Sequence, residues 1–395
     1  MEVSVSGRLR ELAALFLKLG TISFGGPAAH IALMEEEVVH RRRWLTREHF
    51  LDLVGATNLI PGPNSTEMAI HVGFLRGGWP GLIVAGACFI LPAALITAGF
   101  AWVYVRFGSL PNAAPFLMGI KPVVVAVILT AIWRLGKTAV KTWQLLVIGV
   151  IVAATALLGV NEILAFFLGG VGGMCWLSLP HQTRRRHRGN AGVVVASVLG
   201  VHGRSWAAIA VAGAAIATQV SLWKLGLFFL KVGSVLYGSG YVLVAFLQGG
   251  LVRDYGWLTQ QQLLDAIAIG QMTPGPVLST ATCIGYLLAG SAGAVAATVA
   301  IFLPSFVFVA MLNPIIPKLR RLRWTSAFLD AVNVSAIALM AAVLIQFARA
   351  ALADWRAWLI ALVAVAVGLR WKLNTAWLIL GGGLAGWVLS VLVEH

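Results

Sequence analysis

The sequence repeats itself at one constant offset, and this constrains the fold more than any other feature. Three motifs return about 213 residues later, in the same order: Phe16-Leu-Lys-x-Gly20 as Phe229-Leu-Lys-x-Gly233, Trp44-Leu-Thr46 as Trp257-Leu-Thr259, and Pro61-Gly-Pro63 as Pro274-Gly-Pro276. Chance does not hold one register through three separate motifs. We therefore predict two homologous halves, with a first repeat over 1–180, a linker over 181–223 that contains an extra membrane crossing, and a second repeat over 224–395.

Both halves consist largely of apolar stretches. Hydrophobic residues make up 59% of the chain and charged residues 11%, whereas a soluble domain carries about 25% charged residues. About 20 apolar residues suffice to cross a bilayer as a helix. Stretches of that kind lie at 79–105, 116–133, 143–160, 162–180, 206–222, 292–315, 327–348, 355–369 and 373–392. The sequence thus predicts an all-α polytopic membrane protein.

Two further stretches in the first half are interrupted, and their repeats in the second half follow the same pattern. Residues 11–39 contain Phe24-Gly-Gly-Pro27, and residues 48–76 contain Pro61-Gly-Pro63. Proline and glycine end helices at such points. We expect broken helices or helical hairpins that meet near the membrane midplane, where helix N-termini favour an anion. Residues 11–39 either fold back as two short helices, which we favour, or cross the membrane completely.

The distribution of cations predicts that the two halves have opposite orientations. The segment Arg41–Arg47 is strongly basic, whereas its equivalent at 253–257 is neutral, and 106–115 has one Arg where 318–323 has four cations. Because basic loops stay in the cytoplasm, equivalent loops lie on opposite sides, as in an inverted repeat. The net charge of +15 is accordingly attributed to topology and anionic lipid contacts, and no nucleic acid partner is expected.

The candidate substrate-binding residues are the breaks and the polar groups next to them. Lys18 and Lys231 are repeat-equivalent cations in apolar helices, which either contact the anion or extend to the membrane surface. Hydroxyl and amide groups after the breaks either cap helices or bind a ligand. The other candidates are Gly25, Gly26, Pro27, Pro61, Gly62, Pro63, Asn64, Ser65, Thr66, Gly238, Ser239, Gly240, Pro274, Gly275, Pro276, Ser279 and Thr280.

Glu67 and His71 are spaced i, i+4 after the first Pro-Gly-Pro break, and the second half has no titratable equivalent. A carboxyl group at such a break can take up a proton during transport, or it can complete a helix cap. The same pair could act as an acid and base in an intramembrane enzyme, but no nucleophile or metal-ligand set accompanies it. Three separate cysteines and eight unclustered histidines likewise predict no metal and no cofactor. We therefore expect no catalytic residues and no enzyme activity.

The combined motifs resemble the chromate ion transporter family in its long-chain, two-domain form. The resemblance rests on Phe24-Gly-Gly-Pro27, Trp44-Leu-Thr46, Pro61-Gly-Pro63, Phe89-Ile-Leu-Pro92, Pro274-Gly-Pro276 and Phe302-Leu-Pro304. It implies secondary active export of the oxyanion chromate from the cytoplasm across a bacterial-type inner membrane, driven by protons, and resistance to chromate.

The resemblance also leaves several points open. Sulfate has the shape and charge of chromate, so transport of sulfate or another small anion on the same architecture is the alternative, and a channel is a further one. Gly238-Ser-Gly240 stands where the first half has Gly25-Gly-Pro27, so the two halves need not contribute equally. Protons and membrane lipids are expected partners, and a homodimer stays open.

Overall fold

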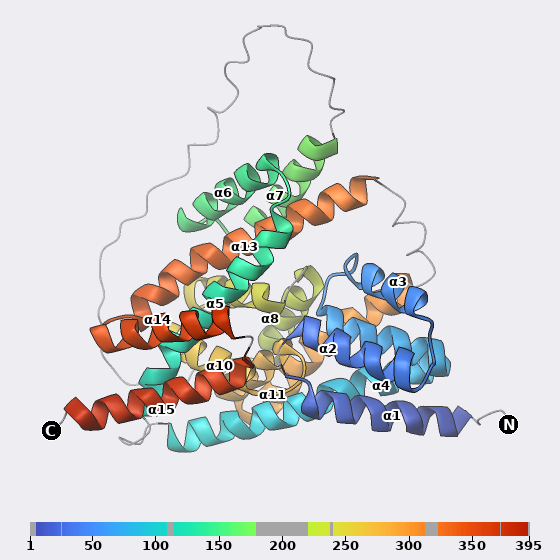
Figure 1. Ribbon diagram of the computed structural model, residues 1–395, viewed down its shortest axis with the longest axis horizontal. Coiled ribbons are helices and arrows are strands. Elements are labelled where there is room, and N and C mark those ends of the chain that lie inside the picture. Colours follow the sequence, from blue (N-terminus) through green and yellow to red (C-terminus); the bar gives the residue numbers. More distant parts are fainter. Residues whose placement is uncertain are drawn as a thin grey trace, which may run out of the picture.

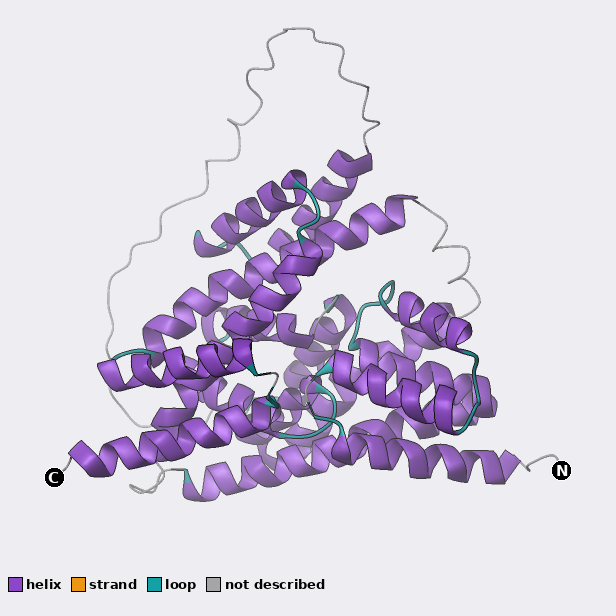
Figure 2. Cartoon of the chain, in the orientation of Figure 1, coloured by secondary structure: helices purple, strands orange, loops and turns teal. Residues whose placement is uncertain are grey.

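The computed structural model describes residues 5–24, 26–108, 114–178, 220–237, 240–312, 323–371 and 373–393, which form helices and short connections without a strand (Figures 1 and 2). The first half contains α1 (Val5–Ile22), α2 (Pro27–Glu35), the π-helix η1 (Glu36–Arg41), α3 (Arg47–Thr57), α4 (Asn64–Phe107), α5 (Ala114–Ala139), α6 (Trp143–Leu157) and α7 (Glu162–Ser178). The second half contains α8 (Leu222–Val235), η3 (Gly240–Val242), α9 (Leu243–Leu247), the π-helix η4 (Gln248–Asp254), α10 (Gln260–Met272), η5 (Val277–Ser279), α11 (Thr280–Leu312), α13 (Arg323–Ala351), α14 (Trp355–Arg370) and α15 (Thr375–Val393).

The second half repeats the elements of the first in the same order. Even the π-helices recur, since η1 and η4 both precede the Trp-Leu-Thr motif. The threonines of that motif, Thr46 and Thr259, cap α3 and α10 by accepting the backbone N–H three residues later. The prediction of an all-helical protein with two homologous halves is confirmed, and the motif's threonine has a structural role.

The two halves exchange their last helices. The long helix α5 of the first half packs against α14 and α15 of the second, and its equivalent α13 packs against α6 and α7 of the first. In Figure 1, α6 and α7 accordingly lie along one end of α13, while α14 and α15 lie at the opposite side of the molecule. Because each half supplies the neighbours of the other half's central helix, the protein folds as one interlocked unit.

The helices after the Pro-Gly-Pro breaks turn back sharply. Gly78 within α4 and Gly290 within α11 adopt φ values of 62° and 61°, in the left-handed region that favours glycine. A Cβ on Gly73 would overlap the carbonyl oxygen of Gly81 across the turn, and the equivalent Gly285 meets Gly293 in the same way. Each long element is therefore a hairpin of two helices whose arms touch backbone to backbone.

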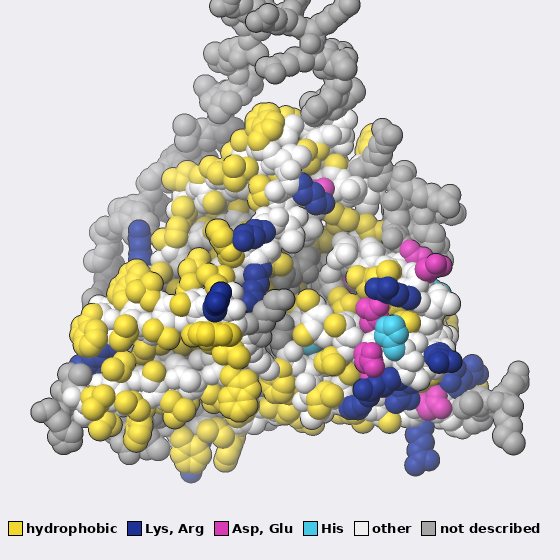
Figure 3. Space-filling view, in the orientation of Figure 1, with side chains coloured by type: hydrophobic (Ala, Val, Ile, Leu, Met, Phe, Trp, Pro, Cys, Tyr) yellow, Lys and Arg dark blue, Asp and Glu magenta, His cyan; other side chains and the backbone are white. Residues whose placement is uncertain are grey.

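Five helices are long and apolar enough to cross a membrane among the described residues: α4, α5, α11, α13 and α15. Large apolar side chains are exposed on them and on α14, where Figure 3 shows a broad hydrophobic surface. The chain is a multi-pass membrane protein. The predicted crossing at 206–222 lies almost entirely outside the described residues, as do the basic segments 184–188 and 318–322.

Helix packing explains why the spacing of Phe-Leu-Lys-x-Gly is the same in both halves. A Cβ on Gly20 of α1 would lie 2.5 Å from the carbonyl oxygen of Phe89, and Gly233 of α8 meets Ile301 in the same way. We expect Gly20→Ala to lower the free energy of unfolding by about 1–3 kcal/mol, because the added methyl group would push the backbones of α1 and α4 apart. Thermal unfolding in detergent measures this. Gly99→Ala, at a glycine with open space around it, is the matched control and should leave the midpoint nearly unchanged.

Candidate functional site

The breaks of the two halves meet through two reciprocal hydrogen bonds. The Gly62 N–H donates to the Leu236 carbonyl oxygen at 2.6 Å, and the Gly275 N–H donates to the Ser23 carbonyl oxygen at 2.7 Å. Each bond joins a Pro-Gly-Pro break to the first break of the opposite half. Since the two bonds exchange under the repeat offset of 213 residues, they lie on either side of a local two-fold axis. The expectation that the breaks converge is confirmed.

A cavity of about 890 Å³ opens beside these breaks. Its walls combine α2 and the breaks of the first half with α5, and with η3, α13 and the α14–α15 connection of the second half. Figure 3 shows the hollow in the middle of this face, with Lys and Arg side chains beside it. A volume of this size exceeds that of a small oxyanion, so there is room for hydrating water.

Arg134 gives the cavity its positive charge. The side chain of Lys141 is paired with Asp330 at 2.8 Å, so its charge is compensated. Arg134 donates from Nη2 to the Gly368 carbonyl oxygen at 2.5 Å, and among the described residues no carboxylate lies within 4.0 Å of its guanidinium group. A guanidinium group held at one edge by a carbonyl keeps further donors for an anion.

Neutral hydrogen-bonding groups surround this cation. They come from both halves, and the lining includes Asn58, Asn64, Thr130, Tyr241, Asn333, Asn374 and Thr375. Amide and hydroxyl groups can donate to a tetrahedral oxyanion without adding charge. The arrangement suits one oxyanion whose oxygens accept hydrogen bonds from several of these side chains.

The N-terminus of α2 also faces the cavity. Gly26 precedes it with a φ of 82°, Pro27 occupies the first turn, and no side chain caps the helix. Phe24, Pro27 and Ala28 line the cavity. An uncapped helix N-terminus carries partial positive charge and so adds to the field of Arg134.

Residues of the first Pro-Gly-Pro segment lie at different depths. Asn64 lines the cavity and donates to Asn58 Oδ1 at 2.6 Å. Pro61, Gly62 and Pro63 are buried in the break, and Ser65 and Thr66 are buried behind it. Within this segment the structure therefore brings Asn64 to the cavity wall.

The second Pro-Gly-Pro segment is buried away from the cavity. Its residues Pro274, Gly275 and Pro276 are covered, and a row of hydroxyl groups runs beside them. Thr97 donates to Thr273 at 3.2 Å, and Thr273 lies 3.4 Å from Ser279. The Thr280 hydroxyl donates to the Val277 carbonyl oxygen at 2.8 Å. Gly240 begins η3 and is buried, whereas Gly25, Gly238 and Ser239 lie outside the described residues.

Glu67 occupies an unusual position in the first half. It is 0% exposed, and neither carboxyl oxygen has a hydrogen-bond partner among the described residues. The Oε1 atom and the Ser305 hydroxyl, also buried without a partner, both crowd the position where a side chain on Gly62 would begin. An ionised carboxylate without partners is costly there. The group is therefore suited to hold a proton, and it does not cap the helix through its side chain.

His71 lies one turn after Glu67 on the same helix. It is 0% exposed. The structure thus keeps the predicted Glu67 and His71 pair together in the protein interior, away from the cavity lining.

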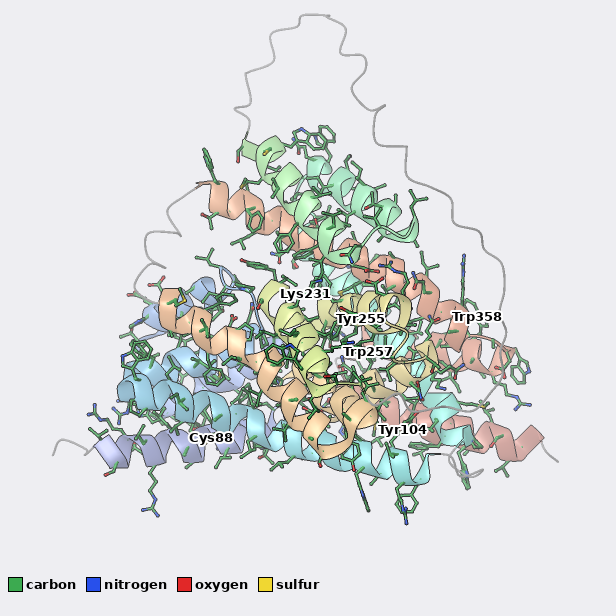
Figure 4. All side chains as sticks on the ribbon, turned by 180° about the vertical axis from the view of Figure 1, so that it is seen from behind. Cys88, Tyr104, Lys231, Tyr255, Trp257 and Trp358 are labelled. Atoms are coloured by element: carbon green, nitrogen blue, oxygen red, sulfur yellow. The ribbon has the colours of Figure 1, made fainter. Side chains whose placement is uncertain are left out.

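Lys18 and Lys231 do not line the cavity. Lys18 Nζ lies 2.7 Å from Glu37 Oε1, and Arg41 and Arg42 donate to the same carboxylate. Lys231 is exposed on α8, where Figure 4 labels it, and within the described part of the chain no carboxylate lies within 4.0 Å of it. Their contact with an anion stays a prediction, which in this conformation would require movement.

The ion cluster at Glu37 gives a pH-dependent contribution to stability. The Lys18 hydrogen bond, with Arg41 and Arg42, lowers the pKa of Glu37 from 4.5. Since the folded pKa is depressed, the stabilisation is present above about pH 4.5 and is lost as the pH falls through the folded pKa. We expect Glu37→Gln to lower stability by about 1 kcal/mol at pH 7, because the partners are partly exposed, and by less at pH 4. Thermal unfolding at both pH values measures this, and an equal loss at both would contradict it.

Arg134 is not among the site residues that the sequence predicted. The signal that could have identified it is asymmetry in the repeat, because Gln346 occupies the equivalent position at the offset of 212 residues that holds after the one-residue slip. A cation that only one half carries, within an apolar helix, indicates a specific task.

Comparisons with known proteins place the chain among its relatives. A family model described as chromate transporter matches the chain twice, over residues 10–174 and 223–387. The chain is 33% identical to a chromate transport protein of Cupriavidus metallidurans, over 98% of this chain and 94% of that protein. It is 30% identical to a chromate transport protein of Pseudomonas aeruginosa, over 96% and 92%.

A shorter relative illustrates the duplication. The uncharacterized transporter YwrA of Bacillus subtilis is 30% identical over 40% of this chain, a match that covers 92% of that protein. No solved structure matches the chain.

Proposed function

The chain belongs to the chromate transporter family, and from this premise we propose that it exports chromate from the cytoplasm as a proton-coupled secondary transporter of the bacterial inner membrane. Cells that carry it would thereby resist chromate. Relatives named as transport proteins support a transport role rather than an enzyme activity. We propose the units 1–180, 181–223 and 224–395 for the two repeats and the linker between them.

The observation that carries the proposal is the Arg134 cation in the cavity, which has no carboxylate partner among the described residues. Chromate is a tetrahedral dianion with four acceptor oxygens. Arg134 would supply the charge, Asn58, Asn64 and Asn333 would supply hydrogen bonds, and the N-terminus of α2 would contribute partial positive charge. Such a site binds the dianion without any metal or cofactor.

The positive-inside rule supports the proposed loading side. The last turn of α5 carries Lys137 and the connection after it carries Lys141, so we place this end of α5 in the cytoplasm. The cavity then faces the cytoplasm and acts as the loading site. Equivalent ends of α13 would face the other side, as an inverted repeat requires.

Proton coupling is assigned to Glu67. A protonated carboxyl is tolerated in its dry position, whereas an ionised one needs water or a cation. Release of its proton therefore requires the buried break to open, which links protonation to the conformation of the Pro-Gly-Pro segment. His71, one turn away, would shuttle the proton.

Sulfate is the second candidate substrate, because the amide and guanidinium donors do not distinguish two tetrahedral dianions of equal charge. We also propose that the protein contacts anionic lipids and forms a homodimer.

Whole cells test the substrate and direction together. Cells expressing the protein should contain less chromate than vector controls in chromate medium and should grow at higher concentrations. Excess sulfate should weaken the difference only if sulfate shares the site. Higher chromate content than in the control would indicate uptake and would contradict export.

A further inference from the structure

The repeat supplies residues equivalent to the cavity lining on the other side of the local two-fold axis. Four lining residues have polar equivalents at offsets of 213 or 212 residues: Asn58 and Gln271, Arg134 and Gln346, Asn333 and Lys121, Asn374 and Glu162. Their equivalents lie on α10, α13, α5 and the start of α7, and α5, α10 and α13 pack against one another. We call Lys121, Gln248, Gln271 and Gln346 the closed cluster.

The closed cluster is shut by contacts that the open side lacks. Gln248 donates from Nε2 to Gln346 Oε1 at 3.1 Å, which joins the end of α9 to α13. In the first half, by contrast, α2 and α5 stand on walls of the cavity. Phe246 of α9 packs edge to face on Phe166 of α7, with ring centroids 5.6 Å apart.

One ion pair holds this side together. Arg253 of η4 donates to both carboxyl oxygens of Glu162 at 2.8 and 2.9 Å. Its repeat equivalents, His40 and Asn374, carry no opposite charges. The equivalent positions on the open side therefore cannot form this bidentate ion pair between the two halves.

Polar atoms inside the closed cluster are left without partners. Gln248 and Gln271 are 6% and 8% exposed, yet Gln248 Oε1 and Gln271 Nε2 have no hydrogen-bond partner among the described residues. Buried amide groups without partners are costly. Water or a ligand could satisfy these amide groups in a conformation that opens the cluster.

We propose that the closed cluster is a second oxyanion site, the release site, which opens to the opposite face when the Glu162–Arg253 ion pair separates. The proposal rests on the transport function above. The two halves would exchange conformations, so that α9 moves away from α13 as α2 approaches α5.

The charges of the two sites differ in the direction that export needs. Lys121, the cation of the release site, already lies 3.7 Å from Asp265, which also accepts the Tyr104 hydroxyl at 2.8 Å (Tyr104 is labelled in Figure 4). Gln346 is neutral where Arg134 is charged. A dianion would be held by a free cation on the loading side and by a compensated one on the release side, so release is favoured.

Cysteine labelling tests the second site without chromate. Cys88, Cys175 and Cys283 are first replaced, and Asn58→Cys or Gln271→Cys is introduced into the full chain. A membrane-impermeant thiol reagent is applied to inside-out and right-side-out vesicles. Asn58→Cys should react from the cytoplasmic side. Gln271→Cys should react only from the opposite side, and Arg253→Met should raise that rate about tenfold, within the usual range of conformational coupling.

Controls separate opening from misfolding. Arg349→Met, at an exposed position on α13, should leave labelling of Gln271→Cys unchanged, and Arg253→Lys, which keeps the charge, should raise it less than Arg253→Met does. Glu162→Gln replaces Arg253→Met if that variant does not purify as a monodisperse protein. The proposal would be overturned if Gln271→Cys reacted from the cytoplasmic side. It would also be overturned if Gln271→Cys did not react from either side in the Arg253→Met and Glu162→Gln variants. If labelling behaves as expected but chromate is not transported, the release site stands and the proposed substrate fails.

Discussion

Replacing Arg134 by Gln is expected to reduce chromate transport about 10- to 100-fold. A hydrogen bond to a charged group contributes about 1.5–3 kcal/mol, and each 1.4 kcal/mol corresponds to a tenfold change. The loss should appear mainly as a weaker apparent affinity, because Arg134 attracts and holds the dianion. Initial rates of chromate uptake into inside-out vesicles, measured over a range of concentrations, give the apparent affinity and the maximal rate.

Two matched variants test whether the loss is specific to the guanidinium group of Arg134. Arg134→Lys keeps the charge but loses the planar guanidinium group, so it should retain part of the affinity. Arg349→Gln removes a cation from an exposed position near the end of α13 and should transport as the parent does. Parent-like transport by a well-expressed Arg134→Gln protein would remove Arg134 from the site.

Replacing Glu67 by Gln is expected to abolish the stimulation of chromate transport by a proton gradient. Glutamine has the shape of a protonated glutamic acid and cannot release a proton. Because the carboxyl group is buried and has no hydrogen-bond partner within the described part of the chain, the variant should be at least as stable as the parent. Chromate exchange without a net gradient should persist, since that needs no proton release. Accumulation against a gradient should fall at least about tenfold, because the proton gradient no longer contributes.

The control for Glu67 is Glu48→Gln, which removes an exposed carboxylate from the first turn of α3. It should keep full stimulation by the proton gradient. A Glu67→Gln protein that still accumulates chromate in proportion to the imposed gradient would show that the coupling proton binds elsewhere.

Much of the fold could be predicted because glycine and proline act locally. The breaks at Phe24-Gly-Gly-Pro27 and Pro61-Gly-Pro63 lie where the sequence places them, since α1 and α3 end before them and α2 and α4 begin at or after them. Most predicted apolar stretches coincide with helices within a few residues. The turn at Gly78 was implied only by the gap between two predicted stretches, because a single left-handed glycine leaves no wider pattern.

The candidate site could be predicted only in part, because it depends on contacts between the halves. The cavity joins α2 and α5 to α13 and the α14–α15 connection, and no local pattern predicts that the halves exchange their last helices. Lys18 was predicted either to contact an anion or to extend to the membrane surface, and neither alternative indicated Glu37, whose Oε1 atom lies 2.7 Å from Lys18 Nζ. Arg134, by contrast, lines the cavity, although its cationic neighbours in sequence are typical of a basic loop at the membrane surface.

Accumulation of labelled chromate in inside-out vesicles is the decisive measurement for proton-coupled export. We expect uptake that an imposed proton gradient drives against the chromate gradient, and we expect the Arg134→Gln variant to lose this uptake. Excess sulfate reports whether the same site takes the second dianion. Accumulation no greater than in vesicles without the protein, under a verified proton gradient, would contradict proton-coupled export of chromate.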